Sequence, residues 1–513
     1  MDSSEHRAIG DAASGGSCVN LGGESAEERF WLGYGDVMAL SGDFFAADPP
    51  AEPDGADAGP TREAGADGNL FSLARVPGDR GRRPGTRDEI VCALRVMAAD
   101  EAIVDARFAP GGRFADFRFD AGAPYGAVER TVRDRYLAQA ATNDDHFLSP
   151  GGITSDVGPR PWGSAALAYG HLHRLALEEA WRLGRDRGDV SSAMAREAAA
   201  QHFLTDAFTA GHLRTPVAQI RRFWLARYPH FWESLQDRVA SETAAALREL
   251  AWALRRLPAG FVSDSTRSAL KTRTSRYPQL SLGDFLARLF HDWDNRHGLQ
   301  IEGGGVVFGD GHVHEGITRD LAVAAVRAGI DDVEAAFTLG ASGGRLTGDP
   351  LYRAVRATTG APAHAFRAEA MIPRPSPSNP RQNWRATDVE TLWDSPIVGA
   401  TGTTVGEALT EMLRPEGQFI RQLDRLGQGL VEPQGLLSVP ILGGWLRQKG
   451  ARAYHRGFVA PLAGHPKRVI LDVVRSGSGD PGPPAAPDRL LPGAGPAPVV
   501  APARDDPRTM AGR

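Results

Sequence analysis

Residues 197–216, EAAAQHFLTDAFTAGHLRTP, combine a strong helical pattern with a dense group of metal-ligand side chains. His202 and Asp206 are four residues apart, so a helix places them on one face, one turn apart. His212 follows after a Thr-Ala-Gly turn. Imidazole and carboxylate are ligands that zinc accepts, and the flanking residues are small or apolar, so the polar trio lies on a core face. The alternative is a His202–Asp206 pair within the helix, with His212 at its end, where the helix dipole favours a protonated His.

Two further segments place a histidine beside carboxylates at a helix boundary. They are TNDDHFLSPGG, which contains His146, and RLFHDWDNRHGL, which contains His291 and Asp294. Singly, each histidine is typical of a surface position or a helix cap. Together with the 197–216 segment they indicate a site for more than one metal ion.

The two best-defined segments resemble the zinc-dependent phospholipase C/S1-P1 nuclease superfamily. DDHFLSPGG is similar to the His-Phe-x-(Asp)-Pro motif of that family, and HFLTDAFTAGH to its His-x3-Asp-x5-His signature. The resemblance covers residues 130–215 well and 30–330 loosely. It implies a mainly α fold, a phospholipase C/P1 nuclease-like helical bundle with insertions and a small β-hairpin, and a site for two or three Zn²⁺ ions.

Carried onto this chain, the resemblance implies metal ligands at His146, His202, Asp206, His212, His291 and Asp294. Asp206 would bridge two ions, and His212 would hold another ion together with His291 and Asp294. His230 with Glu233 is the rival pair for that last position, because it lies nearer in the sequence.

The chain departs from the family at the N-terminus, where the mature family members bind zinc through the amino group of a Trp. Asp36 and Asp43, in GYGDVMALSGDFF, are candidate substitutes, seven residues apart and thus on one face of a helix. Their alternative use is helix capping and turns. Asp134 stands where the family has the Asp that orients the attacking water, although its charged surroundings also fit a solvated helix position.

Other histidines carry weaker signals. His171 and His173 point to opposite faces of one helix, so at most one faces the cluster. In FGDGHVHE, residues 308–315, the Asp-Gly pair favours a turn, with contact between Asp310 or a histidine and the site as the alternative.

The order of patterns predicts a mainly helical chain. Helices are expected over 86–104, 281–290 with Ser281 as N-cap, and 317–338, and in three or four segments between 162 and 257. Gly-centred turns predict a β-hairpin within 299–315.

The expected organisation is a disordered N-terminus over 1–28 and a helical metal-binding body over 29–340, with a flexible loop at 47–69. A C-terminal helical region of unassigned role follows at 341–475, and a Pro/Gly/Ala-rich disordered tail occupies 476–513.

Composition excludes several classes of protein. The chain has 513 residues, a formal net charge of −5 and two cysteines, which argues against a nucleic-acid-coating protein and a disulfide scaffold. No basic-aromatic stripe indicates a nucleic-acid module. No run of about 18 apolar residues predicts a transmembrane segment. With no readable signal peptide the expected location is the cytoplasm, with signal-independent secretion as the alternative.

The function expected from these patterns is a zinc-dependent phosphoesterase that hydrolyses a phosphodiester, either a phospholipid or a nucleotide, with a metal-activated water. An HD-type phosphohydrolase is the second hypothesis, with His291 and Asp292 as the adjacent pair and His202 upstream. A non-enzymatic helical binding protein with a structural His/Asp cluster is the third.

Overall fold

The computed structural model describes eleven main stretches: residues 1, 3–21, 29–47, 71–73, 83–108, 143–147, 165–215, 229–250, 281–301, 303–343 and 346–359. Single residues or pairs between 128 and 268, and residue 456, are also described. Within this part the protein is mainly α-helical, as the sequence predicts.

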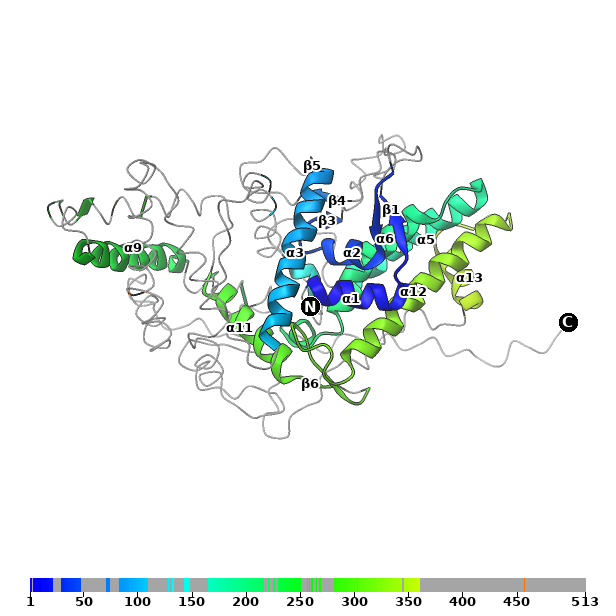
Figure 1. The fold of residues 1–513 in the computed structure, drawn as a ribbon. Helices are drawn as coiled ribbons and strands as arrows, with labels where there is room; N and C mark the ends of the chain where they lie inside the picture. Colours follow the sequence, from blue (N-terminus) through cyan, green and yellow to red (C-terminus); the bar gives the residue numbers. More distant parts are fainter. Residues whose placement is uncertain are drawn as a thin grey trace.

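Three long helices form the centre of the fold: α5 (Ala165–Asp186), α6 (Ser191–Asp206) and α12 (Thr318–Ala341). They pack side by side, with α13 (Asp349–Thr359) against one end (Figure 1). Alanine and leucine side chains fill the contacts between them. Glycine permits the closest crossing, because a Cβ on Gly184 would lie 2.0 Å from the Phe337 carbonyl oxygen and a Cβ on Gly340 2.0 Å from that of Trp181.

The N-terminal residues form a second layer on α6 and α12. Helix α1 (Ser3–Ser14) packs on α2 (Tyr34–Leu40), and the two are linked through the antiparallel pair β1 (Cys18–Asn20) and β2 (Trp31–Gly33). The buried stripe of α1 consists of His6, Ile9, Gly10 and Ala13, a helical spacing. The expected disorder of residues 1–28 is therefore wrong for α1 and β1.

Helix α3 (Arg87–Phe108) contacts α1 and α2, and three short strands, β3 (Ala46–Ala47), β4 (Phe71–Leu73) and β5 (Arg83–Pro84), form a small antiparallel sheet. The one-turn 3-10 helix η1 (Asp144–His146) contacts α5 and α6. After α6, the short helix α7 (Ala210–Arg214) leads toward α9 (Phe231–Leu250), which lies away from the central helices in Figure 1.

Helix α11 (Leu282–His297) has Ser281 as its N-cap. The Ser281 hydroxyl accepts from the Asp284 N–H, and the Asp284 carboxylate accepts from the Ser281 N–H. This reciprocal cap confirms Ser281 as the predicted N-cap. Strands β6 (Leu299–Gln300) and β7 (Val306–Val307) then form the predicted hairpin, and α7 packs against α11.

Several expectations fall outside the described residues. They include the loop after Ala47 up to residue 70, the predicted helix over 126–142 apart from residues 128 and 132, and the tail from 476. The C-terminal region is described up to Thr359 and at residue 456. Among the helices described, none has the length and apolar character needed to cross a membrane.

Candidate metal centre

The candidate site lies at the C-terminal end of α6, where His202 and Asp206 are one turn apart. We call the Met1 amino group, His6, His146, His202, Asp206 and His212 the Asp206 cluster. Both oxygens of the Asp206 carboxylate face this cluster, and the Asp206 side chain is buried. On the Oδ1 side lie the Met1 amino nitrogen at 2.8 Å, His6 Nε2 at 3.3 Å and His212 Nδ1 at 3.4 Å. On the Oδ2 side lie His146 Nδ1 at 2.6 Å and His202 Nε2 at 3.4 Å.

The chain brings these groups together from five parts of the fold. α6 ends at Asp206, and the backbone turns at Thr209 into α7, which returns His212 to Asp206. The Thr209 hydroxyl fixes this turn by donating to the Asp206 carbonyl at 2.8 Å. His146 enters from η1, and Met1 and His6 from the N-terminal layer. Of the six ligands that the resemblance implies, His146, His202 and His212 thus lie around the carboxylate of a fourth, Asp206.

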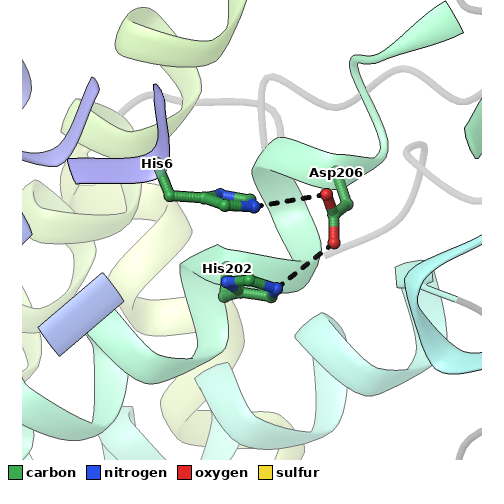
Figure 2. Close-up of side chains that lie close together, drawn as sticks. All are labelled: His6, His202 and Asp206. Atoms are coloured by element: carbon green, nitrogen blue, oxygen red, sulfur yellow. Dashed lines mark ion pairs between the residues drawn. The ribbon is translucent and has the colours of Figure 1, made fainter. Parts of the chain in front are cut away.

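The histidine tautomers can be inferred from hydrogen-bond partners that only accept. His202 Nδ1 lies 3.0 Å from the Met38 carbonyl oxygen, so Nδ1 donates and Nε2 carries a lone pair. The Thr205 hydroxyl donates to the carbonyl of Gln201, so His6 Nδ1, 2.7 Å from that hydroxyl, also donates. In neutral His6 and His202, therefore, Nε2 presents a lone pair to a carboxylate oxygen of Asp206 (Figure 2).

Electrostatics favours the forms of these residues that bind metals. Burial, reinforced by the neighbouring His6, lowers the pKa of His202 well below its usual value. Burial and the positive N-terminus lower the pKa of His212 in the same way. Burial opposes ionisation of Asp206, but the surrounding positive groups outweigh it and hold its pKa well below normal. At neutral pH the Asp206 carboxylate is thus ionised and the His202 and His212 imidazoles are neutral, as metal ligands must be.

Two members of the cluster are instead more basic than usual. Burial disfavours charge on His146, but its hydrogen bond to Asp206 outweighs this and raises its pKa. The Met1 amino group also loses hydration, yet Asp206 and Asp310 raise its pKa to about 11. A positive charge is therefore stabilised beside Asp206.

The geometry fits a metal ion in two ways. The lone pair on His202 Nε2 faces an ionised carboxylate and repels it, unless a cation lies between them. The absence of a side chain at Gly42, which has a φ of +82°, also keeps the ligand atoms clear. A Cβ there would lie 2.5 Å from His202 Nε2. Two sets of side chains have ligand atoms within 4.8 Å of one another: His6, His202 and Asp206; and Asp43, His146 and His202.

A third set with the same property consists of His291, Asp292 and Asp310, which we call the His291 group. His291 Nδ1 lies 2.8 Å from Asp292 Oδ1, and the His291 ring lies 4.7 Å from that of His212, centroid to centroid. Phe147 packs edge-on against both rings. The described residues can therefore hold more than one metal ion.

The other sequence candidates are placed as follows. Asp36 caps the start of α2 by accepting from the Gly33 N–H and pairs with Arg7, so it lies outside the three sets. Asp43 lies beyond the end of α2 and belongs to the site, where the Ser3 hydroxyl donates to it at 2.5 Å. The predicted shared helical face is thus wrong, because α2 ends at Leu40.

Near His291, the carboxylates that lie close enough to share a metal ion with it are those of Asp292 and Asp310, and not that of the predicted Asp294. Asp294 is buried on α11, but it is absent from the three sets of ligand atoms. The rival pair, His230 and Glu233, is exposed. Asp134 lies outside the described residues.

His6 is not among the predicted ligands, because the sequence pattern predicts disorder over residues 1–28. The signal was the spacing of His6, Ile9, Gly10 and Ala13, which is that of one helical face. Asp310, considered only as an alternative, joins the site because the β6–β7 hairpin returns the chain to α11.

His173 lies in a separate buried group formed by residues of α2, α5, α6 and α12. We call His173, Glu197, Gln201, Tyr34, Tyr169 and Asp332 the Glu197 network. The closest contact joins His173 Nδ1 to Glu197 Oε2 at 2.7 Å, and Gln201 donates to Glu197 Oε1 at 2.9 Å.

Comparison of the chain with family models, with curated proteins and with solved structures gives no match. The residues of the site are therefore the basis of the proposed function.

Proposed function

We propose that this protein is a metal-dependent phosphoesterase of the zinc phospholipase C/P1 nuclease type, with two or three Zn²⁺ ions. The observation that carries the proposal is the Asp206 carboxylate, which has nitrogen donors beside each of its two oxygens. A carboxylate so placed can bridge two ions. Nitrogen and oxygen donors without thiolate are also suited to hydrolytic zinc sites.

The residues of the chain would hold and orient the ions. His146, His202 and Asp43 face Asp206 Oδ2 or one another, and His6 and His212 face Oδ1. The Met38 carbonyl and the Thr205 hydroxyl fix the rings of His202 and His6, so that Nε2 is the ligand atom in each. When bound, zinc polarises a phosphoryl oxygen and lowers the pKa of a bound water.

A phosphodiester would approach from the side of the cluster that reaches solvent. The side chains of Asp43 and Asp310 are 20% and 12% exposed, whereas that of Asp206 is 1% exposed. The covered Asp206 thus serves as the fixed bridge, and the partly exposed carboxylates border the reaction volume. Phospholipid and nucleotide diesters are both consistent with this arrangement.

The experiment compares wild-type protein with Asp206→Asn and Asp332→Asn, each reconstituted with zinc and assayed on bis(p-nitrophenyl) phosphate. Asp332 is the matched control, because it is also a buried Asp but belongs to the Glu197 network. We expect hydrolysis by wild type and Asp332→Asn, and loss of both zinc and hydrolysis in Asp206→Asn. Wild-type protein that binds zinc but hydrolyses no diester would favour a non-enzymatic binding protein instead.

The HD-type alternative has one supporting observation, the contact between His291 and Asp292. It also needs His202 to share their metal ion. His202 instead belongs to the two sets around Asp206 and Asp43, and His291 to a separate set. The geometry therefore supports this alternative less well.

A further inference from the structure

Asp310 lies between the Asp206 cluster and the His291 group. Its Oδ1 is 3.2 Å from the Met1 amino nitrogen, which itself contacts Asp206. Its Oδ2 is 3.7 Å from His291 Nε2. The two oxygens of this carboxylate therefore face two different parts of the site, as those of Asp206 do.

We propose that Asp310 is a second bridging carboxylate, which joins the ion on the Asp206 Oδ1 side to an ion held by His291 and Asp292, and that Glu5 is the residue that positions it. This inference rests on the proposed metal site. It adds a ligand from the hairpin region and a positioning residue from α1.

The backbone at Asp310 is constrained to present its side chain. Asp310 has a φ of 20°, a value that residues other than glycine rarely adopt, and Gly309 and Gly311 flank it. Gly309 is packed so closely on α11 that a Cβ there would lie 2.1 Å from the Asn295 amide oxygen. Such a conformation persists only where its surroundings determine it, and it is common at functional sites.

Glu5 supplies part of that constraint. Its Oε1 accepts from the backbone N–H of Gly311 at 2.8 Å and from that of Val313 at 3.3 Å. The Gly309 N–H donates to the Asn295 carbonyl and ties the other side of the turn to α11. Glu5 precedes His6 on α1, so one helix places both an imidazole of the Asp206 cluster and the turn that carries Asp310.

The test measures zinc equivalents bound per full-length chain, by mass spectrometry of the metal after gel filtration, in five proteins. They are wild type, Asp310→Asn, Glu5→Ala, Glu5→Gln and Glu315→Ala. We expect Asp310→Asn and Glu5→Ala to lose about one equivalent, or to bind the last ion about 10–100-fold more weakly, as is usual when such supports are removed. Glu5→Gln retains an oxygen acceptor for the two N–H groups and should bind as wild type does.

Glu315 is the matched control for Glu5, because it lies in the loop that Glu5 contacts and pairs with His312 at the surface. Cobalt substitution gives a second readout, since loss of a bridging ligand alters the visible absorption of bound Co²⁺, whereas a change in folding stability alone does not. Asp310→Asn retains side-chain volume, so it tests whether Asp310 is a metal ligand even if Glu5→Ala fails to fold.

The outcomes separate this inference from the proposed function. If wild type binds two or three ions and Asp310→Asn binds them equally tightly with the same cobalt spectrum, the inference is overturned and the proposed function stands. If wild type binds no zinc, both are overturned. If Glu5→Gln loses an ion as Glu5→Ala does, Glu5 acts through its charge and not by holding the turn.

Discussion

Two buried clusters of histidine and carboxylate share helix α6, and they differ in how their polar atoms are satisfied. In the Asp206 cluster, four imidazoles and an amino group surround one carboxylate, and the lone pair on His202 Nε2 faces it. In the Glu197 network, one imidazole lies between two carboxylates, Glu197 and Asp332. Tyr169 and Gln201 complete the bonding of Glu197 by donating to its Oε1. Similar residue types thus form a site suited to a cation in one place and an internal ion pair in the other.

The protonation of the central histidines follows the same difference. His202 is kept neutral by burial and by positive neighbours, which lower its pKa. Burial also opposes charge on His173, but Glu197 and Asp332 outweigh it and raise its pKa. The ratio of imidazoles to carboxylates therefore indicates which cluster is suited to an external cation.

The largest expected effect on stability comes from breaking the Glu197 network. Glu197→Ala leaves the charge of His173 buried beside Asp332 alone, and the free energy of unfolding should fall by about 3–5 kcal/mol. Urea unfolding in the presence of a chelator measures this without a contribution from metal. The control is Asp186→Ala, which removes an exposed pair with Arg185 on α5 and should leave the urea midpoint of unfolding unchanged. A loss as small as that of the control would mean that Glu197 carries no structural role.

Zinc should stabilise the protein through the proposed metal centre and not through the Glu197 network. At a free zinc concentration 100-fold above Kd, binding adds about 2.7 kcal/mol to the free energy of unfolding. We expect this gain in wild type and in His173→Gln, and little of it in Asp206→Asn. Thermal unfolding with and without zinc provides the measurement, and an equal gain in all three proteins would place the metal elsewhere.

Gly42→Ala tests how closely the backbone approaches the ligand atoms. A Cβ at this position would lie 2.4 Å from His202 Cδ2 and 2.9 Å from His146 Cε1, so overpacking should cost about 1–3 kcal/mol and weaken zinc binding. Gly15→Ala is the control, because Gly15 has a similar φ of +67° with nothing within 4 Å of the added Cβ. Both substitutions strain the backbone, so the difference between them isolates the steric contact. Equal zinc affinity in the two variants would show that the ligand atoms have room to move.

The smallest expected effect is on the pH dependence of stability. The folded protein holds the proton on His173 more tightly than the unfolded chain does, so the pKa is raised on folding. Its stabilising contribution is therefore complete below the ordinary His pKa of about 6.5 and is lost as pH rises through the raised folded value. The difference in stability between wild type and His173→Gln should shrink over that interval. A difference that grows with pH would mean that His173 is neutral in the folded state.

The sequence predicts the parts of the molecule that depend on local patterns. The helical character, the cap at Ser281 and the 299–315 hairpin follow from short-range spacing and turn chemistry, and the structure confirms them. The i,i+4 spacing of His202 and Asp206 likewise places both on one turn of α6. These predictions succeed because a helix or a turn fixes the relative positions of residues close in sequence.

The parts that could not be predicted depend on tertiary contacts. His6 and Asp310 lie about 200 and 100 residues from Asp206 in sequence, and no local pattern connects them to it. Asp36 and Asp43 are equivalent in the sequence, and only the end of α2 at Leu40 separates the helix cap from the candidate ligand. The two carboxylates beside His173 likewise come together only in the folded chain.

The central claim is that the Asp206 cluster and the His291 group bind metal. The direct measurement is the zinc content of full-length wild-type protein, purified without chelator, reconstituted and analysed by mass spectrometry of the metal. We expect two or three equivalents per chain, with the loss of most of them in Asp206→Asn and their retention in Asp332→Asn. Zinc content below one-tenth of an equivalent in folded wild-type protein, or the same content in all three proteins, would contradict it.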